Sequence, residues 1–137
     1  MLTGTHGARF TWLDDNRILM LDFGSVKSSV EEMDKALDGL QKAMDSWPTD
    51  KPYLCLICAD KLATTMWTPV SRQKSEVLMG KLPKHLHGRV AVVLKNNPIA
   101  FILRFFIERI ANRRLRTIQN RVFFNRDEAL EWLRERL

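Results

Sequence analysis

The sequence predicts an α/β fold: one mixed sheet of about five strands, flanked by about four helices, in the order ββαβαβαβα. Short apolar runs alternate along the chain with longer segments in which apolar residues recur every three or four positions. This alternation is typical of a mostly parallel sheet with right-handed crossovers. The 137 residues, 45% of them hydrophobic, suffice for one domain with its own core. We expect that domain at residues 9–137, after a loose polar segment at residues 1–8.

The N-terminal segments predict a hairpin followed by a helix. Residues 9–13 alternate between apolar and polar, residues 14–16 (Asp-Asp-Asn) form a turn cluster, and residues 17–23 are mostly apolar. Two such strands joined by a short polar turn are typical of an antiparallel β-hairpin. A helix is expected over residues 28–47, because a Ser-x-x-Glu capping box opens this segment and a proline follows it.

The remaining segments predict strands and helices in alternation. Two continuous apolar runs, at residues 53–58 and 89–94, are typical of central strands covered on both faces. Each is followed by a capping residue and a proline, so helices are expected at about residues 68–80 and 97–113. A fifth strand at residues 120–124 and a last helix at residues 125–137, opened by the capping pair Asn125 and Glu128, complete the order.

The two cysteines, Cys55 and Cys58, lie inside the third predicted strand. Residues three apart in a strand point to opposite faces, so the pair cannot easily share a metal ion or form a disulfide. Buried free thiols are typical of a reducing compartment. The N-terminus has no apolar leader, and the most apolar helical stretch, residues 99–107, is far shorter than the roughly 20 residues that span a bilayer. We therefore expect a cytoplasmic protein.

Basic residues gather in the C-terminal part of the chain. Residues 1–80 contain 9 Lys and Arg against 11 Asp and Glu, whereas residues 81–137 contain 13 against 5, a net charge of +8. A basic half attracts polyanions such as nucleic acid, acidic lipid headgroups or an acidic protein. The alternative is a solvated surface that keeps the protein soluble. The sequence has none of the recognisable nucleic-acid motifs, so nucleic acid is not the expected partner.

The C-terminal half resembles a known family. An Arg-x-Ala-Val-Val strand begins at Arg89, Asn97-Pro98 opens the next helix, and a closing segment runs from Phe123 through Asp127-Glu128-Ala129-Leu130-Glu131-Trp132-Leu133. These segments resemble the SpoIIAA-like proteins, which share the STAS fold and are related to CRAL-TRIO lipid-transfer domains. The resemblance implies a small regulatory or ligand-binding module rather than an enzyme.

The resemblance does not extend to the phosphorylation switch of the wider STAS group. Members of that group act as anti-sigma-factor antagonists, in anion transporters, and as binders of nucleotides or lipids. The antagonists carry a phosphorylatable Ser in an Asp-Ser-Ser/Thr-Gly motif after the third strand. Here residues 60–65 are Asp-Lys-Leu-Ala-Thr-Thr, with neither the Ser nor the Gly, so the switch is not carried over to this chain.

The loops after the third and fourth strands are a candidate ligand site. They lie at the carboxyl ends of adjacent parallel strands, the edge at which open α/β sheets bind ligands. The helix N-termini that follow add donor amides, so this edge could hold an anion; the alternative is ordinary capping by Thr68 and Asn97. The candidate ligand-binding residues are Asp60, Thr64, Thr65, Trp67, Lys95, Asn96 and Asn97.

Metal and catalytic signatures are weak. His85 and His87 stand two apart, but no Cys, Asp or Glu lies close enough in sequence to complete a metal site. The sequence has no Gly-rich phosphate loop, Gly-x-Ser-x-Gly elbow or paired-carboxylate arrangement. We therefore expect no metal, no cofactor and no catalytic residue.

The helix at residues 98–113 predicts an unusual surface. The face of its helical wheel that we expect in the core contains Ile99, Leu103, Phe106 and Ile110, flanked by Ile102 and Ile107. Phe101 and Phe105 fall on the other side beside Arg104, and they form an exposed apolar strip unless a dimer partner, a lipid or a loop covers them. A basic patch follows, made of Arg113, Arg114, Arg116 and Arg121. Trp47 and Trp132 are expected in the core.

These features predict a non-catalytic, cytoplasmic, STAS-like regulatory or binding module that acts through protein–protein contacts as a homodimer. The first alternative is a module that binds an apolar ligand such as a lipid, or an anionic membrane surface, through the Phe101 and Phe105 strip and the arginines. The second alternative is a small enzyme with its site at the loops near Asp60.

Overall fold

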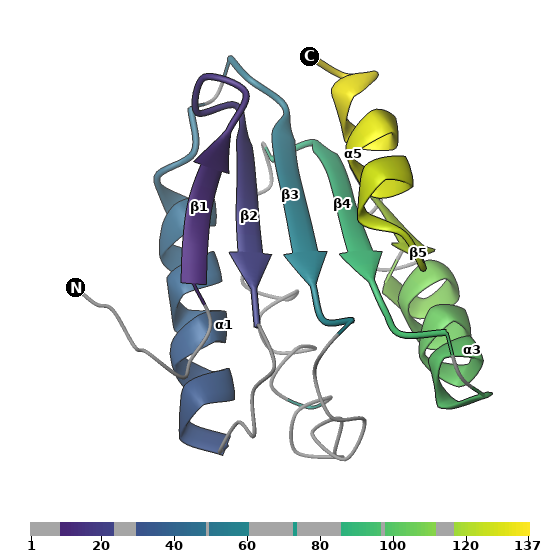
Figure 1. Ribbon diagram of the computed structural model, residues 1–137. Coiled ribbons are helices and arrows are strands. Elements are labelled where there is room, and N and C mark those ends of the chain that lie inside the picture. Colours follow the sequence, from purple (N-terminus) through teal and green to yellow (C-terminus); the bar gives the residue numbers. More distant parts are fainter. Residues whose placement is uncertain are drawn as a thin grey trace.

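The computed structural model describes residues 9–23, 30–48, 50–60, 73, 86–96, 98–111 and 117–137. In these residues five strands form one mixed sheet in the order β1-β2-β3-β4-β5, with helices on both of its faces (Figure 1). The strands are β1 (Arg9–Leu13), β2 (Ile18–Asp22), β3 (Tyr53–Cys58), β4 (Gly88–Val93) and β5 (Ile118–Phe123). The helical elements are α1 (Val30–Asp45), α3 (Pro98–Phe105), its π-helical continuation η2 (Phe106–Ala111), and α5 (Arg126–Arg134). The predicted α/β class is confirmed.

The strand pairing follows the predicted topology. β1 and β2 pair antiparallel as a hairpin, and β2, β3, β4 and β5 pair parallel. The bounds of β1 and β3 are those predicted, and the other strands shift by one or two residues. Two predictions lie outside the described residues: the loose segment at residues 1–8, and the helix at residues 68–80, of which Gln73 alone is described.

The two faces of the sheet bury separate apolar clusters. One face packs against α1 through strand residues that include Leu19, Leu21, Tyr53 and Cys55. The opposite face packs against α5 through Leu54, Leu56, Cys58, Ala91, Val93 and Phe123. In Figure 1, α1 lies behind the sheet and α5 in front of it. Because successive strand residues alternate between faces, both sets of positions in β3 must be apolar, which explains its continuous apolar run.

The turn of the hairpin has a left-handed backbone. Asp14, Asp15 and Asn16 have φ angles of 50, 57 and 63°, and the N–H of Arg17 donates to the carbonyl of Leu13 at 3.1 Å. Asp and Asn adopt this conformation more readily than most residues, because their short polar side chains can bond locally. The predicted turn is therefore confirmed.

The last helix begins as predicted. Oδ1 of Asn125 accepts hydrogen bonds from the backbone N–H groups of Asp127 at 2.7 Å and Glu128 at 3.2 Å. These bonds satisfy two of the amides that a helix start leaves without intrahelical partners. The helix ends at Arg134 rather than at the predicted Leu137.

The predicted core face of the helix at residues 98–113 is partly wrong. Ala100 is buried and Ile107 packs in the same cluster, so both of these positions face the core. Ile102, expected beside the core, is instead 70% exposed, because it lies about 200° from Ala100 at roughly 100° per residue. The side chains of the four residues expected at the centre of the core face, Ile99, Leu103, Phe106 and Ile110, lie outside the described residues.

This helix also changes type along its length. It is α-helical to Phe105 and π-helical from Phe106 to Ala111. A π-helix bonds each residue to the one five positions away, rather than four, and so has more residues per turn. A single helical wheel therefore does not describe the whole segment.

Trp47 is buried as predicted, whereas Trp132 is only partly buried. The Trp132 ring packs against that of Phe123 with centroids 5.6 Å apart. The guanidinium carbon of Arg89 lies 4.7 Å from the same ring's centroid. The fully buried positions of α5 are Ala129 and Leu133, so Trp132 lies at the rim of the core rather than at its centre.

Candidate functional site

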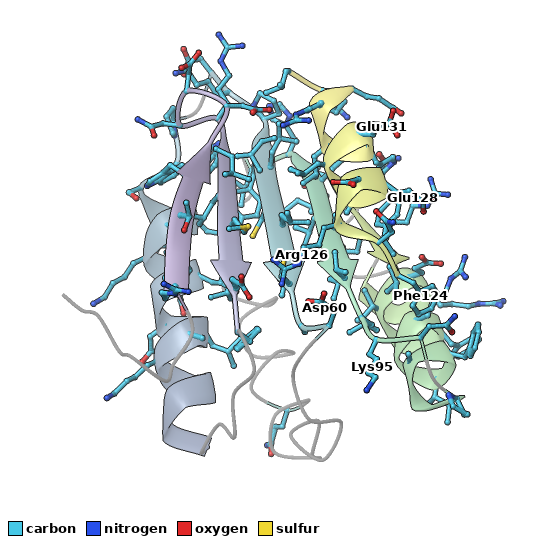
Figure 2. The ribbon with its side chains drawn as sticks, viewed as in Figure 1. Asp60, Lys95, Phe124, Arg126, Glu128 and Glu131 are labelled. Carbon is cyan, nitrogen blue, oxygen red and sulfur yellow. The ribbon has the colours of Figure 1, made fainter. Side chains whose placement is uncertain are left out.

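Three large apolar side chains of α3 face solvent, and we call them the α3 strip: Phe101, Ile102 and Phe105. Phe101 is 55% exposed and Phe105 is 59% exposed, as predicted for this pair. The addition of Ile102 makes the strip wider than predicted. The ring centroid of Phe101 lies 5.7 Å from that of Phe124, which follows β5 beside α3 (Figure 2). The apolar surface therefore extends from the helix to the end of the sheet.

Charged side chains border the α3 strip. Nε of Arg104 pairs with Oε1 of Glu108, one turn later, at 3.3 Å. The guanidinium carbon of Arg109 lies 5.6 Å from the centroid of the Phe105 ring. Arg121, of the predicted basic patch, is exposed but lies on the α5 face of the sheet, where its guanidinium carbon is 5.1 Å from the Phe123 ring centroid. The other members of that patch, Arg113, Arg114 and Arg116, lie outside the described residues.

Glu108 fixes the position of the α3 strip on the sheet. Its Oε2 accepts a hydrogen bond from the backbone N–H of Val122 at 2.8 Å. β5 is the last strand of the described sheet, so amides on its outer side need acceptors from elsewhere. The π-helical segment η2 carries this carboxylate to the strand. The helix that bears the strip is thus tied to the sheet edge by a polar contact as well as by apolar packing.

A charged cluster, which we call the edge clamp, joins the carboxyl ends of β2 and β3 to α5. Nη2 of Arg126 donates to Oδ1 of Asp60 at 3.0 Å, and the same guanidinium contacts both carboxylate oxygens of Asp22 at 3.3 and 3.4 Å (Figure 2). The hydrogen bond to Asp60 raises the pKa of Arg126 above its ordinary value. Asp60, a candidate ligand residue, is therefore part of an ion pair that holds three elements together.

Two other candidate ligand residues are described. Lys95 and Asn96 are exposed in the loop between β4 and α3, and Lys95 extends away from the edge clamp in Figure 2. The remaining candidates, Thr64, Thr65, Trp67 and Asn97, lie outside the described residues. A ligand site at these loops therefore stays a prediction.

The two cysteines are buried free thiols on opposite faces of the sheet, as predicted. Cys55 lies in the cluster under α1 and Cys58 in the cluster under α5. Burial raises the pKa of the Cys55 thiol to about 12 and that of Cys58 to about 11, although Arg126 partly opposes the shift at Cys58. Because the thiolate is the reactive form, neither side chain is suited to act as a nucleophile at neutral pH.

The described residues contain no cluster suited to a metal ion. No three His, Cys, Asp or Glu side chains among them gather closely enough to hold one. His87 is exposed, and His85 lies outside the described part of the chain. None of the helices in that part is long and apolar enough to cross a membrane.

Several residues of these sites are absent from the sequence-based predictions: Asp22 and Arg126 of the edge clamp, and Glu108 and Arg109 beside the α3 strip. The sequence contains a signal from which the edge clamp could have been predicted. Asp22 ends the second predicted strand and Asp60 follows the third, and the carboxyl ends of parallel strands meet at one edge. Two carboxylates brought together there need a cation, and Arg126 stands at the start of the helix that packs on the same edge. Glu108 and Arg109 carry no comparable signal, because their contacts depend on the π-helical turn.

Comparison with known proteins identifies the fold. The chain matches no protein-family model and no curated protein. It is similar to a solved structure, an uncharacterised protein of the DUF3478 family from Shewanella loihica PV-4 that has a SpoIIAA-like fold. The two chains are 21% identical, and the match has a TM-score of 0.61 and covers 97% of this chain and 98% of that one. The fold of this chain is therefore SpoIIAA-like, as the sequence resemblance predicts.

Proposed function

We propose that this SpoIIAA-like chain is a non-catalytic binding module of the cytoplasm, which associates with a second copy of itself through the α3 strip. The observation that carries the proposal is the exposure of three large apolar side chains on one helix, Phe101, Ile102 and Phe105. A contiguous apolar patch rimmed by charged residues is typical of a contact surface.

The charges beside the α3 strip favour a second copy as the partner. A two-fold contact brings the same surface together from both subunits, so this surface must be complementary to itself. Arg104 and Glu108 carry opposite charges and lie one helical turn apart. If two α3 helices pack antiparallel about an axis between these positions, Arg104 of each copy lies opposite Glu108 of the other. The same packing covers Phe105 of both copies.

The expected dimer is weak. The strip consists of a few side chains on one helix, whereas stable interfaces bury about 1,200–2,000 Å² in total. We therefore expect a concentration-dependent monomer–dimer equilibrium. An exchanging contact of this kind suits a regulatory module, because a second partner can compete for the same surface.

The described residues support a role without catalysis. The carboxylates at the sheet edge, Asp22 and Asp60, are held by Arg126, and burial raises the pKa values of both cysteine thiols. Acid–base and nucleophilic catalysis need groups that can change protonation state or attack a substrate. The edge clamp instead has the character of a structural ion-pair cluster, so an enzyme site near Asp60 has less support. Buried free thiols also fit a reducing compartment.

An anionic membrane surface is the second candidate partner. Arg104 and Arg109 are exposed beside the strip, and the guanidinium carbon of Arg109 lies 5.6 Å from the centroid of the Phe105 ring. Apolar and aromatic side chains next to basic ones are typical of helices that lie at an anionic lipid surface. Ile102, the most exposed large apolar residue among those described, would enter the headgroup region first.

The test replaces the two phenylalanines of the strip with aspartate, as Phe101→Asp together with Phe105→Asp. Sedimentation equilibrium over a range of concentrations should show dimers for the wild type and monomers for the variant, because a carboxylate buried in an apolar contact loses water without gaining a partner. Leu137→Asp is the matched control, since Leu137 is also an exposed large apolar residue but lies outside the strip. Circular dichroism checks that each variant is folded.

Two outcomes would overturn the dimer. One is a wild type that is monomeric at every concentration; the other is a double variant that dimerises as well as the wild type. Flotation with phosphatidylserine vesicles distinguishes the second candidate partner, an anionic membrane surface, from a second copy of the chain. If the strip binds membranes, the wild type floats with the vesicles, the double variant does not, and the two proteins have the same subunit count.

A further inference from the structure

A pocket opens at the end of the sheet opposite to the edge clamp. Its volume is about 260 Å³. It lies where the hairpin turn, the segment before β3 and the end of the chain meet. The ten described residues that line it are Trp12, Asn16, Arg17, Trp47, Pro48, Lys51, Pro52, Leu54, Arg136 and Leu137. They come from three separate parts of the chain, so no local sequence pattern marks them as one site.

The apolar wall of the pocket is held in place by specific contacts. Nε1 of Trp47 donates to the carbonyl of Pro52 at 3.0 Å, and the Trp47 ring meets Tyr53 edge-on with centroids 4.8 Å apart. The Trp12 ring lies 5.5 Å from that of Trp47 and tilts by 32°. Trp12 is still 48% exposed. Trp47 itself is only 6% exposed, so the preformed surface open to a ligand is the exposed part of the Trp12 indole, which Trp47 supports. Preformed walls reduce the entropy lost on binding.

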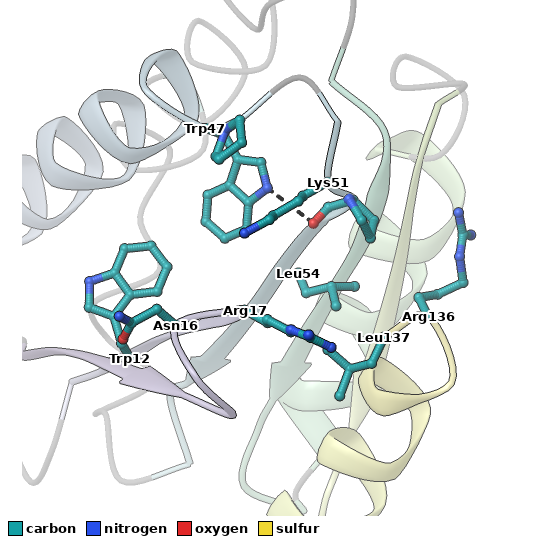
Figure 3. Close-up of a pocket in the computed structure, with 10 residues that line it drawn as sticks. Trp12, Asn16, Arg17, Trp47, Lys51, Leu54, Arg136 and Leu137 are labelled. Atoms are coloured by element: carbon teal, nitrogen blue, oxygen red, sulfur yellow. Dashed lines mark hydrogen bonds between the residues drawn. The ribbon is translucent and has the colours of Figure 1, made fainter.

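The polar side of the pocket is cationic. Arg17, Lys51 and Arg136 are among the lining residues, and none of the ten is Asp or Glu. In Figure 3, Lys51 extends toward the Trp47 ring and Arg17 toward Leu137, while the guanidinium of Arg136 points away from the tryptophans. Within the described residues, no ion pair engages any of these three side chains. A main-chain carboxylate at Leu137 would offset one positive charge and still leave an excess of two.

One acidic residue of the hairpin turn, Asp14, already forms an ion pair. Both carboxylate oxygens of Asp14 accept hydrogen bonds from Arg134, at 2.8 and 3.2 Å. This ion pair ties the turn that carries Arg17 to the end of α5. It therefore holds the turn beside the end of α5. Arg17 also attracts the Asp14 carboxylate electrostatically, but among the described residues neither Arg17 nor Lys51 forms an ion pair.

We propose that this pocket binds a small organic anion with a flat apolar body, in the simplest case an aromatic carboxylate. An aromatic ring can stack on the exposed part of the Trp12 indole. The carboxylate can then form a charge-assisted hydrogen bond with Lys51, which extends toward the Trp47 ring, while Arg17 adds a second positive charge to the pocket. The volume lies just below the range of roughly 300–1,000 Å³ that is common for ligand pockets, so a single ring fits better than a nucleotide or a lipid tail. This site is independent of the α3 strip.

The test compares benzoate with its neutral analogue benzamide, observed through the indole N–H signals in ¹H–¹⁵N spectra. The chain has 4 tryptophans. Benzoate should shift the signals of Trp12 and Trp47 in a saturable way and leave that of Trp132 unchanged, because Trp132 lies outside the pocket. Benzamide should bind at least about tenfold more weakly, since it lacks the charge that the cations recognise. Benzoate binding should also weaken with added salt.

Two variants assign the binding to this pocket. Arg17→Gln and Lys51→Gln replace exposed side chains, so both should fold, and each should weaken benzoate binding by about tenfold. Lys42→Gln, which removes an exposed cation of α1 outside the pocket, should bind benzoate like the wild type. The proposal is overturned if benzoate does not shift Trp12 and Trp47, if benzamide binds as tightly as benzoate, or if all three lysine and arginine variants behave alike.

Discussion

Gly88, at the start of β4, is a residue that no other amino acid can replace without strain. Its φ is +148°, and a Cβ placed on it would lie 1.9 Å from the carbonyl oxygen of Tyr53. The contact is with backbone, which cannot move aside as a flexible side chain can. We expect Gly88→Ala to lower the free energy of unfolding by about 3 kcal/mol. Urea denaturation followed by circular dichroism measures this loss.

Gly39 of α1 is the matched control for Gly88. The three nearest atoms to a Cβ there all belong to the ring of Phe10, the closest at 2.7 Å, and that ring is exposed enough to shift. Alanine also favours a helix over glycine by roughly 1 kcal/mol, which offsets the cost of moving the ring. Gly39→Ala should therefore change stability little. Equal losses in the two variants would show that the close approach of β3 and β4 at Gly88 is not what makes glycine necessary.

Single residues were predictable from the sequence where their roles depend on the local chain. The turn at Asp14 and Asn16, the helix cap at Asn125 and the buried cysteines follow from backbone conformation, short-range hydrogen bonds and strand alternation. Arg126 and Ile102 were not predicted. Arg126 meets Asp60 across 66 positions of the sequence, and the exposure of Ile102 depends on which face of α3 the sheet covers. The contact of Arg126 and the exposure of Ile102 can be predicted only when the tertiary arrangement of the elements is known.

At the scale of elements, α5 shows how much a partly buried side chain can contribute to holding a helix on the sheet. Trp132 contacts Phe123 and Arg89, and Nη1 of Arg89 also donates to the Trp132 carbonyl at 2.7 Å. Full burial of a tryptophan would make its truncation cost about 3–5 kcal/mol. Because Trp132 is only partly buried, we expect Trp132→Ala to cost about 2 kcal/mol in the free energy of unfolding, measured by urea denaturation.

Leu133, the neighbour of Trp132 in α5, provides the comparison. It is fully buried against the sheet, so Leu133→Ala should cost about 2–5 kcal/mol and more than Trp132→Ala, although the leucine side chain is smaller. The reverse order would mean that the tryptophan, rather than the leucine, docks the helix.

The ion pair between the hairpin turn and α5 should make stability depend on pH. The hydrogen bond from Arg134 holds the pKa of Asp14 below its ordinary value of 3.8. A carboxylate whose pKa is lowered by folding stabilises the fold above its ordinary pKa, and this contribution is lost as the pH falls through the lowered pKa. The urea midpoint of the wild type should therefore fall more steeply below about pH 4 than that of Arg134→Gln. Parallel curves for the two proteins would contradict a role for the pair.

Elements were predictable where the periodicity of apolar residues is simple. β1 and β3 have the predicted bounds: the Asp-Asp-Asn turn follows β1 directly, and Pro52 precedes β3. The change from α3 to η2 was not predictable, since it accompanies a contact between Glu108 and the edge of β5. The local pattern of apolar residues predicts a regular helix, whereas a π-helical turn depends on the tertiary contacts that the helix makes.

At the scale of the whole molecule, the arrangement of strands decides where sites form. The carboxyl ends of β3 and β4 were the expected location for a ligand, and of the residues described there Asp60 belongs to an ion-pair cluster around Arg126. A pocket lies at the opposite end of the sheet, at the amino ends of β2 and β3, and two tryptophans and three cations are among its lining residues. General rules about α/β sheets point to the carboxyl edge. These rules do not predict a pocket at the opposite end of the sheet, because the hairpin turn and the C-terminal residues that form it are not part of the general pattern that the rules describe.

Because charge is unevenly distributed over the molecule, dimerisation and membrane binding should respond differently to added salt. Residues 81–137, which include α3, carry a net charge of +8, so dimerisation through the α3 strip brings two basic regions together. Salt screens this repulsion, with a Debye length of about 10 Å at 0.1 M, and strengthens apolar association when the salt is kosmotropic. Added sodium sulfate should therefore tighten the dimer in sedimentation equilibrium. Binding to anionic vesicles should respond in the opposite way, because salt screens an attraction there. A dimer that weakens as salt is added would mean that pairs such as Arg104 with Glu108, rather than the apolar strip, dominate the contact.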